Sequence, residues 1–533
     1  MSRPWLHRRL RAAVAAGLAV ALAGCSAITP AGEPAQAPAQ PVRGGTLIVG
    51  SVGNNWTTLD PLTTNTSIGP YWSMYEPLFE YRPDGAGKSA VAPKLAVSGN
   101  LDDPLRPVIH LRTGVTFHDG TPFDAQAAAW NIEQMRHVPG STAARTLGDV
   151  TGVEVVNADT IRLTLSAPSP SIFVRLSSSA GPGRAMVSPA AVRAHGREWL
   201  ARNESGTGPF TLKKFVPDTR TDVVAFPGYW DTGADGAKLP YVDGIAYELL
   251  RDTSAAMLGL QAGSVDVVAG PTKAMLDQAA RSKTVRAVEL TTSNSYPGTF
   301  GFNATRAPFD DVRVRQAAQL AIDRRTLVKV VYPNSSEPAQ LPLWNDSMPG
   351  WSEGLDHVYD FDLAKAKRLA GEARLAPGTR ATLIYQSREP DATIAQVWKQ
   401  MWAEIGIDLI TTPLEETVFE SRLAAGDFDV ATWNWGTPLT PDLAAEYLQA
   451  GGRQNWVHYD NPAVNDLFAQ ASGAGGETGQ ADRYGKALSA VMQDAVYGVV
   501  LRQSPYVLQR GAVGGIREIW GGQDITRAYK GQS

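Results

Sequence analysis

Residues 381–435 read ATLIYQSREPDATIAQVWKQMWAEIGIDLITTPLEETVFESRLAAGDFDVATWNW, and this stretch decides the fold class. Three short apolar runs predict buried strands, at 381–386, 407–411 and 428–433. Between them, apolar residues at helical spacing predict two helices, at 394–405 (ending before Gly406) and 415–425. The order β-α-β-α-β is typical of a parallel sheet covered by helices, so we predict an α/β fold.

The rest of the chain has the same alternation of strands and helices. Strands are predicted at 46–51, which opens the folded part, and at 160–165. Helices are predicted after Asp124, a suitable N-cap residue, throughout 311–330, and at 484–495 near the C-terminus. The α/β pattern therefore continues outside the stretch quoted above.

Length and composition limit the architecture further. A chain of 533 residues suits two or three domains rather than one compact core. A hydrophobic fraction of 43%, with 51 Gly and 36 Pro, is that of a globular protein. The single cysteine, Cys25, excludes a disulfide framework, a thiolate zinc cluster and an iron–sulfur centre.

The N-terminus has the pattern of a lipoprotein signal peptide, which we place at 1–25. Four arginines precede an apolar run at 12–23, which is too short to cross a hydrocarbon core of about 30 Å as a helix. The run ends in Leu-Ala-Gly-Cys at 22–25, which resembles the bacterial lipobox, where the cysteine is lipidated. The alternative is an ordinary cleavage site that contains a cysteine.

Residues 26–41 are rich in Ala and Pro and predict a flexible tether between Cys25 and the folded part. We therefore expect an exported protein, in the periplasmic space, anchored to the outer face of the cell membrane by the lipid alone. No later run of 18 apolar residues predicts a membrane span. Removal of the signal peptide removes four arginines and no acidic residue, so the mature chain has a more negative net charge than the −4 of the whole sequence. This acidic charge argues against nucleic acid as a partner.

The sequence has no motif that predicts catalysis, a cofactor or a metal site. The histidines that follow the signal include no pair at helical metal-binding spacing, and neither Gly-x-Ser-x-Gly nor Ser-x-x-Lys occurs. Gly87-Lys88-Ser89 lacks the upstream glycine of a phosphate-binding loop, because that position is Arg82. We therefore expect a binding protein rather than an enzyme.

Two loops are candidates for the ligand site, because ligands of open α/β sheets bind beyond the carboxyl ends of strands. They are 52–56, after the first predicted strand, and 434–438, after the strand that ends at Trp433. Both combine asparagine with tryptophan, which suits hydrogen bonds to backbone-like groups and contact with apolar surface. The candidate residues are Asn54, Asn55, Trp56, Trp433, Asn434, Trp435, Gly436 and Thr437. The alternative, which applies most to Trp433, is that the tryptophans are core residues.

Seven segments, in order from about Gly44 to about Gly515, resemble a known family. They are GGTL at 44–47, TLDP at 58–61, YEPL at 75–78, LRTGVTFHDGTPFDA at 111–125, GTGPF at 206–210, FNATRAPFDDVRVRQAAQLAID at 302–323 and NPAVNDL at 461–467. The ordered set resembles solute-binding protein family 5, the dipeptide- and oligopeptide-binding lipoproteins of ABC importers.

The resemblance implies a two-lobe, type II periplasmic-binding-protein fold with an extra domain inserted in the first lobe. The implied ranges are 42–78, 204–294 and 503–533 for the first lobe, 79–203 for the insert, and 295–502 for the second lobe. The lobes close over a ligand, the two candidate loops face each other, and a permease with cytoplasmic ATPases recognises closure. The implied protein is a monomer without cofactor, and the resemblance adds Asn303 to the ligand-binding residues.

One position departs from the family pattern. In the family's peptide binders an aspartate that follows Gly-Trp by three residues pairs with the peptide's amino group, whereas here that place is Pro438. A buried ammonium without a carboxylate partner would cost several kcal/mol. Either Asp442, the nearest acid onward, or another acid such as Asp60 takes the role, or the ligand has no free α-amino group. Peptides lead, and blocked peptides, glycans and metal chelates stay open.

Two other functions remain as alternatives to importer binding. An exported hydrolase of peptides or sugars would turn over its bound ligand, whereas a binding protein returns it intact. A sensor on the same scaffold would signal to a partner other than a permease.

Overall fold

The computed structural model describes most of the chain after the predicted tether. The described residues are 40–52, 56–64, 69–83, 89–144, 146–290, 295–331, 337–340, 344, 348–387, 391–436, 440–452, 454–472, 477–502, 505–519 and 522–531. Cys25, Asn54, Asn55, Thr437 and Pro438 lie outside them.

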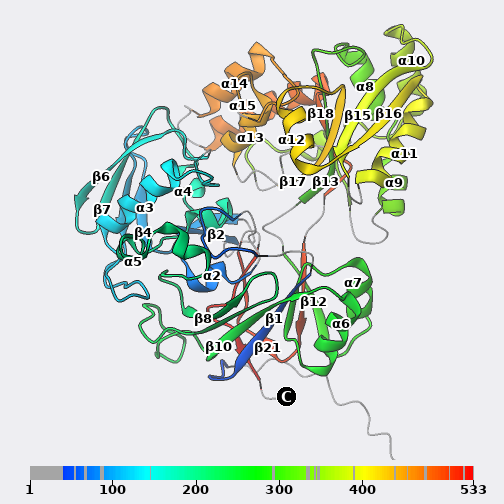
Figure 1. Ribbon diagram of the computed structural model, residues 1–533. Coiled ribbons are helices and arrows are strands. Elements are labelled where there is room, and N and C mark those ends of the chain that lie inside the picture. The colour runs from blue at the N-terminus through cyan, green and yellow to red at the C-terminus, as the bar shows by residue number, and fades with distance from the viewer. Residues whose placement is uncertain are drawn as a thin grey trace, which may run out of the picture.

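The first lobe is built on a mixed sheet with β1 (Thr46–Val52) inside it, as the apolar run at 46–51 predicts. In the described residues the strand order is β12-β20-β11-β1-β10-β9-β8. Its other strands are β8 (Phe210–Val216), β9 (Arg220–Ala225), β10 (Gly244–Leu250), β11 (Val267–Ala269), β12 (Val285–Glu289) and β20 (Tyr506–Arg510). β1 is parallel to both neighbours, and β20 brings the C-terminal segment back into this lobe (Figure 1). Helices α6 (Thr253–Ala262) and α7 (Lys273–Ala279) pack beside it.

The insert is a smaller antiparallel sheet with the order β4-β5-β7-β6 among the described residues. Its strands are β4 (Ala96–Asn100), β5 (Val108–Leu111), β6 (Val150–Asn157) and β7 (Thr160–Leu165), and its helices include α3 (Ala125–His137) and the short α4 (Ile172–Arg175). The predicted helix start at Asp124 is confirmed, since its Oδ1 accepts a hydrogen bond from the Ala127 N–H at 2.9 Å. Ala128, Ile132 and Met135 form its buried face, also as predicted.

The second lobe contains the stretch that decides the fold class. Among described residues its sheet has the order β16-β15-β17-β13-β18, with β13 (Ser295–Phe302), β15 (Thr379–Gln386), β16 (Ile407–Leu414), β17 (Val430–Gly436) and β18 (Tyr497–Gly498). β15 is parallel to β16 and β17, with α11 (Asp391–Ala403) and α12 (Glu416–Ala424) between the strands, which confirms the predicted β-α-β-α-β unit. β13 and β18 add antiparallel strands that the periodicity does not indicate.

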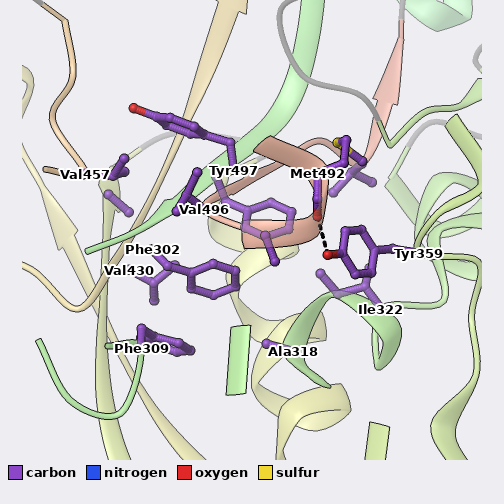
Figure 2. Packing of buried hydrophobic residues seen from close by; sticks show 14 of the residues in the cluster. Phe302, Phe309, Ala318, Ile322, Tyr359, Val430, Val457, Met492, Val496 and Tyr497 are labelled. Carbon is purple, nitrogen blue, oxygen red and sulfur yellow. Dashed lines mark hydrogen bonds between the residues drawn. The ribbon is translucent and has the colours of Figure 1, made fainter. Parts of the chain in front are cut away.

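Aromatic residues fill the core of the second lobe. Trp398 and Trp402 are fully buried and stack with ring centroids 5.7 Å apart, and the Trp402 Nε1–H donates to the Ala318 carbonyl at 2.9 Å. Figure 2 shows the adjoining part of this core, where Phe302, Phe309, Tyr497 and other residues from several elements pack together. The helical stripe of α11 is thus the side of the helix that covers the sheet.

The prediction of a single helix at 311–330 is wrong. The segment forms two helices, α8 (Val312–Leu320) and α9 (Arg324–Val331). Asp323 interrupts the first, because its carboxylate accepts hydrogen bonds from the backbone N–H and the hydroxyl of Thr326, at 3.0 and 2.6 Å, and starts a new helix. The apolar spacing continues through the break and gives no sign of it.

The remaining elements complete the lobes. The helices are α2 (Tyr71–Met74), α5 (Pro189–His195), α10 (Leu363–Glu372), α13 (Pro441–Leu448), α14 (Pro462–Ser472) and α15 (Glu477–Asp494), with 3-10 turns η1 (Ser178–Ala180), η2 (Pro182–Arg184), η3 (Arg197–Ala201) and η4 (Glu353–His357). The short strands are β2 (Phe79–Pro83), β3 (Ser89–Pro93), β14 (Glu337–Pro338), β19 (Leu501–Arg502), β21 (Val513–Gly514), β22 (Arg517–Ile519), β23 (Gly522–Asp524) and β24 (Tyr529–Lys530). Across the part of the chain that the structure describes, we find no helix with the length and apolar character that a membrane span requires.

The insert and the first lobe share their cores. Leu62, which precedes the insert, packs in the core of the insert, while Ala185, Val187 and Leu200 of the range predicted for the insert belong to the core of the first lobe. The core of the second lobe contains only residues of the second lobe. The molecule therefore consists of two bodies, the first lobe with its insert and the second lobe.

Candidate functional site

The ends of β1 and β17 both lie where the chain passes from one lobe to the other. Ser51 of β1 pairs with Ala269 of β11, which pairs in turn with Val507 of β20. Val507 is close to the point where the chain returns to the first lobe. Gly436 of β17 pairs with Ser295, the first described residue after the chain enters the second lobe. The two strand ends from which the candidate loops continue are therefore at the junction of the lobes (Figure 1).

The structure places Trp56 in the core of the first lobe. Its side chain is 1% exposed, and its Nε1–H donates to the Thr221 hydroxyl at 2.9 Å. The Trp56 ring is therefore buried in the core, which agrees with the alternative that the tryptophans are core residues. Asn54 and Asn55, the residues before it, lie outside the described residues.

Trp433 is also a core residue, 4% exposed, with its ring packed edge-on against Trp456 and Tyr497. Asn434, Trp435 and Gly436 are the last residues of β17 and so reach the lobe junction. Thr437 follows them outside the described residues. Of the tryptophans on β17, Trp435 is the one next to the strand end.

Asn303 is at the opposite end of the second-lobe sheet. It follows the last residue of β13, which pairs with Val430 at the start of β17, whereas Ser295 pairs with Gly436 at its end. The length of a seven-residue strand, roughly 20 Å, separates the two ends. Asn303 is 1% exposed, and its amide binds the Gly426 carbonyl and the Thr305 N–H and hydroxyl. The structure does not bring Asn303 together with the other candidates.

Asp442 takes part in an ion pair between the lobes. It lies in the first turn of α13, and its Oδ2 accepts hydrogen bonds from the Ser171 hydroxyl and from Arg175 Nη2, the latter at 3.4 Å. The same Arg175 Nη2 is 3.2 Å from Glu446 Oε1, one turn further along α13. Ser171 and Arg175 belong to the insert, so these four residues, which we call the interlobe cluster, connect the insert to the second lobe.

The second acid proposed for a ligand amine is also paired with an arginine. Asp60 is 6% exposed, its Oδ1 lies 2.6 Å from Arg197 Nη2, and the same oxygen accepts the Leu62 N–H at 3.0 Å. Both acids that the sequence offers for a ligand ammonium, Asp442 and Asp60, are therefore engaged by arginines of the protein.

The interlobe cluster is the feature that sequence reasoning missed. One signal was present: Asp442 and Glu446 are acids at i and i+4 of a helix, an arrangement that repels unless a cation lies against it. The cation, Arg175, is 267 residues away from Asp442 in the sequence. Pairing over that separation is a product of the fold, and no local pattern identifies the partner.

The HDG and GTGPF segments of the family resemblance join the insert to the first lobe. His118 donates through Nδ1 to Glu204 at 2.6 Å and through Nε2 to the Gly208 carbonyl at 2.9 Å, and its own N–H binds the Gly206 carbonyl. Burial disfavours the imidazolium, but Glu204 and the carbonyl outweigh it and raise the pKa of His118. Because acceptors face both ring nitrogens, the fold favours the charged form of this histidine.

The YEPL segment has a similar structural role. Glu76 is 1% exposed and accepts hydrogen bonds from the Thr207 hydroxyl, the Tyr229 hydroxyl and the Trp230 Nε1–H, at 2.8 to 3.0 Å. Burial raises the pKa of Glu76, although Lys94, 3.4 Å away, opposes the shift. Lys94 comes from the segment between β3 and β4, so this cluster too fixes the insert to the first lobe.

Within the described ranges, no cluster of His, Cys, Asp and Glu could hold a metal ion. A surface groove of about 580 Å³ lies on the second lobe, between the turn at 350–352 and α15, and contains none of the predicted ligand residues. Its lining includes Trp351 and the Asp482–Lys486 pair, which are on the surface of one lobe only.

The fold and the position of the strand ends define a two-lobe α/β solute-binding protein. The sequence matches the profile of bacterial extracellular solute-binding proteins, family 5 (middle region), over residues 90–456. It is 30% identical over 448 residues to the glutathione-binding protein GsiB of Escherichia coli O1:K1 / APEC, which covers 80% of this chain and 82% of that protein. The chain therefore belongs to solute-binding protein family 5, as the ordered segments indicate.

Solved structures agree on the fold. HbpA2 of Haemophilus parasuis superposes with a TM-score of 0.77 at 23% identity, covering 92% of this chain and 100% of that chain. The periplasmic binding protein DppA of Helicobacter pylori, solved in complex with the peptide STSA, gives a TM-score of 0.74 at 22% identity over 92% and 98% of the two chains. The predicted two-lobe fold is confirmed.

Proposed function

We infer that this chain is the ligand-capturing component of an ABC importer and that its ligand is a peptide or peptide-like solute. The observation that carries this is the register of the two sheets, which brings the ends of β1 and β17 to the lobe junction. A ligand that touches both lobes stabilises the closed state by its differential affinity, and no covalent step is needed. GsiB is named for glutathione and the DppA structure holds a peptide, which supports the peptide class.

The same proposal includes the route to the membrane. The mature protein is exported, carries a lipid on Cys25, and stands on a tether that ends near residue 41, where the folded part begins. It acts as a monomer and delivers its ligand to a permease with cytoplasmic ATPases. A binding role without catalysis is also the role for which the family is named.

The ligand's amino end is held differently from the pattern of the family's peptide binders. Asp442 is paired with Arg175 and Asp60 with Arg197, so a guanidinium of the protein already balances the charge of each carboxylate. A carboxylate balanced in this way attracts a ligand ammonium less strongly than an unpaired one would. We therefore propose a solute whose recognition depends on its amide groups and side chains rather than on a free α-amino group.

Mass spectrometry of molecules released on denaturing the purified protein tests the ligand class. We expect species with peptide bonds, and a ligand added at 100 times its Kd should stabilise the fold by about 2.7 kcal/mol. Trp435→Ala should weaken binding at least tenfold, whereas Trp351→Ala, a matched change on the surface groove, should leave it unchanged. Release of no peptide-like molecule, together with no thermal shift by any peptide, would contradict the proposal, as would turnover of the bound ligand.

A pair of synthetic ligands tests the amino end. For the released peptide and its N-acetyl form, we expect Kd values within about tenfold of each other, because no carboxylate is committed to the ammonium. A loss of a thousandfold or more on acetylation, about 4 kcal/mol, would show that a carboxylate binds the amine after all.

A further inference from the structure

The insert is fixed to the first lobe, so a residue of the insert moves with that lobe. The His118–Glu204 pair and the Glu76 cluster join the two, and their cores interpenetrate at Leu62 and at Leu200. Arg175 at the end of α4 is held in turn by the insert: its Nε–H donates to Ser171 and its Nη1–H to the Thr146 carbonyl, at 2.9 and 3.0 Å. Its guanidinium is therefore set in place before it meets the second lobe.

The acids that Arg175 meets are fixed to the second lobe. They lie on α13, whose Ala444, Ala445 and Leu448 are buried in the core of that lobe. The contact is shielded from water, since the Arg175 side chain is 6% exposed and those of Asp442 and Glu446 are 14% and 13% exposed. Figure 1 shows α4 next to α13, on the side of the molecule away from α6 and α7.

The interlobe cluster is a polar contact, because none of the apolar clusters formed by described residues contains residues of both bodies. Apart from the chain crossings after Leu290 and before Pro505, the interlobe cluster is thus a contact through which the two bodies meet.

We propose that the interlobe cluster is a latch that sets the fraction of closed protein, and through it the apparent affinity for the ligand. This inference rests on the proposed function, since it concerns the regulation of the same site. When the lobes separate, Arg175 and both acids regain water, so the pairing contributes to the closed state only. Because the latch is made by protein groups, it favours closure whether or not a ligand is present.

The consequence for binding is quantitative. A ligand that binds the closed state has an apparent Kd equal to its intrinsic Kd divided by the closed fraction. Charge-assisted hydrogen bonds to buried groups are among the stronger interactions in proteins. Removal of both acids should lower the closed-to-open ratio at least tenfold, about 1.4 kcal/mol. Where the open state then predominates, ligand affinity should fall by the same factor.

The test measures lobe opening without any ligand. Spin labels on Val156→Cys in the insert and Val418→Cys in the second lobe, both exposed positions, report the distance between the bodies by double electron–electron resonance. Cys25→Ser makes the labels unique. The latch is removed on the α13 side, by Asp442→Asn with Glu446→Gln, because Arg175 also supports the insert. The matched control is Asp466→Asn with Glu420→Gln, which changes the same charge at exposed positions of the same lobe.

We expect the long-distance population to grow at least tenfold relative to the short one in the latch variant, and the control to match the parent. Equal distance distributions in the latch variant and the parent, with the circular dichroism spectrum unchanged, would overturn the proposal. The outcome does not depend on the ligand class, so a failure of the proposed function, in which no peptide binds, is distinguished from a failure of the latch.

Discussion

Replacing His118 by glutamine should destabilise the body formed by the first lobe and the insert. The histidine donates one hydrogen bond to Glu204 and one to the Gly208 carbonyl, both buried. A glutamine amide reaches only one of these acceptors, and hydrogen bonds that involve charged groups are worth about 1.5–3 kcal/mol each. Glu204 keeps backbone donors from Gly206 and Leu212, which limits the damage. We expect a loss of about 3 kcal/mol at pH 6.

The loss should depend on pH in a defined direction. The pKa of His118 is raised in the folded protein, because Glu204 and the Gly208 carbonyl outweigh the effect of burial. A histidine with a raised folded pKa contributes its full stability below its unfolded value, about 6.5, and loses that contribution as the pH rises through the folded value. The difference between the parent and His118→Gln should therefore shrink steadily above pH 6.5.

Urea unfolding followed by circular dichroism, at several pH values between 6 and 9, measures both effects. His137→Gln is the matched control, since that side chain is 64% exposed and lies on the surface of α3. A difference in unfolding free energy that stays the same across this pH range would refute the idea that the fold favours the imidazolium. A difference below about 0.5 kcal/mol at pH 6 would refute the structural role itself.

Three further changes separate structural residues from ligand residues. Asn303→Ala should lower the free energy of unfolding in urea by about 2–3 kcal/mol, because its buried partners lose their hydrogen bonds. The ligand Kd should stay unchanged, and a tenfold change in Kd would show that Asn303 belongs to the ligand site. Trp402→Ala should lower the free energy of unfolding by about 3–5 kcal/mol and reduce the near-ultraviolet circular dichroism signal of the stacked Trp398 and Trp402 rings. A retained signal would contradict this packing. Asp60→Asn should lower the calorimetric melting temperature of the first lobe by leaving Arg197 buried without its partner, and an unchanged melting temperature would argue against that pair.

The second lobe was predictable where its pattern is local. The stripe from Ile394 to Ile405 and the apolar runs on each side of it give α11, β15 and β16, because burial against one sheet imposes a fixed period. β13 has no such pattern: its sequence, SYPGTFGF, contains Pro297 and two glycines, which argue against a strand. The register shift between Tyr296 and Thr299 accommodates them, and a shift of that kind depends on the neighbouring strand.

The sequence predicts the candidate site to the level of strand ends and no further. Parallel order predicts that ligand loops follow β1 and β17, and the register places both strand ends at the lobe junction. Sequence does not tell whether a tryptophan near the end of a strand faces the core, and the structure shows that Trp433 does. Nor does it reveal that Asp442 is paired, because Arg175 reaches it only after both lobes have folded and met.

The segments that resemble the family contain residues that hold parts of the scaffold together. Glu76 of YEPL, His118 of the HDG segment, Thr207 of GTGPF and Asn303 of FNATRAPFDD each bind other parts of the protein through buried side chains. A lobe that closes as a rigid body needs such internal contacts whatever ligand it binds. Ligand binding can move the insert together with the first lobe only if these contacts hold the two together. Resemblance through these segments therefore identifies the scaffold rather than the ligand. On the proposed function, the residues that select the ligand are at the ends of β1 and β17, and on the proposed latch Arg175 also affects the apparent affinity there.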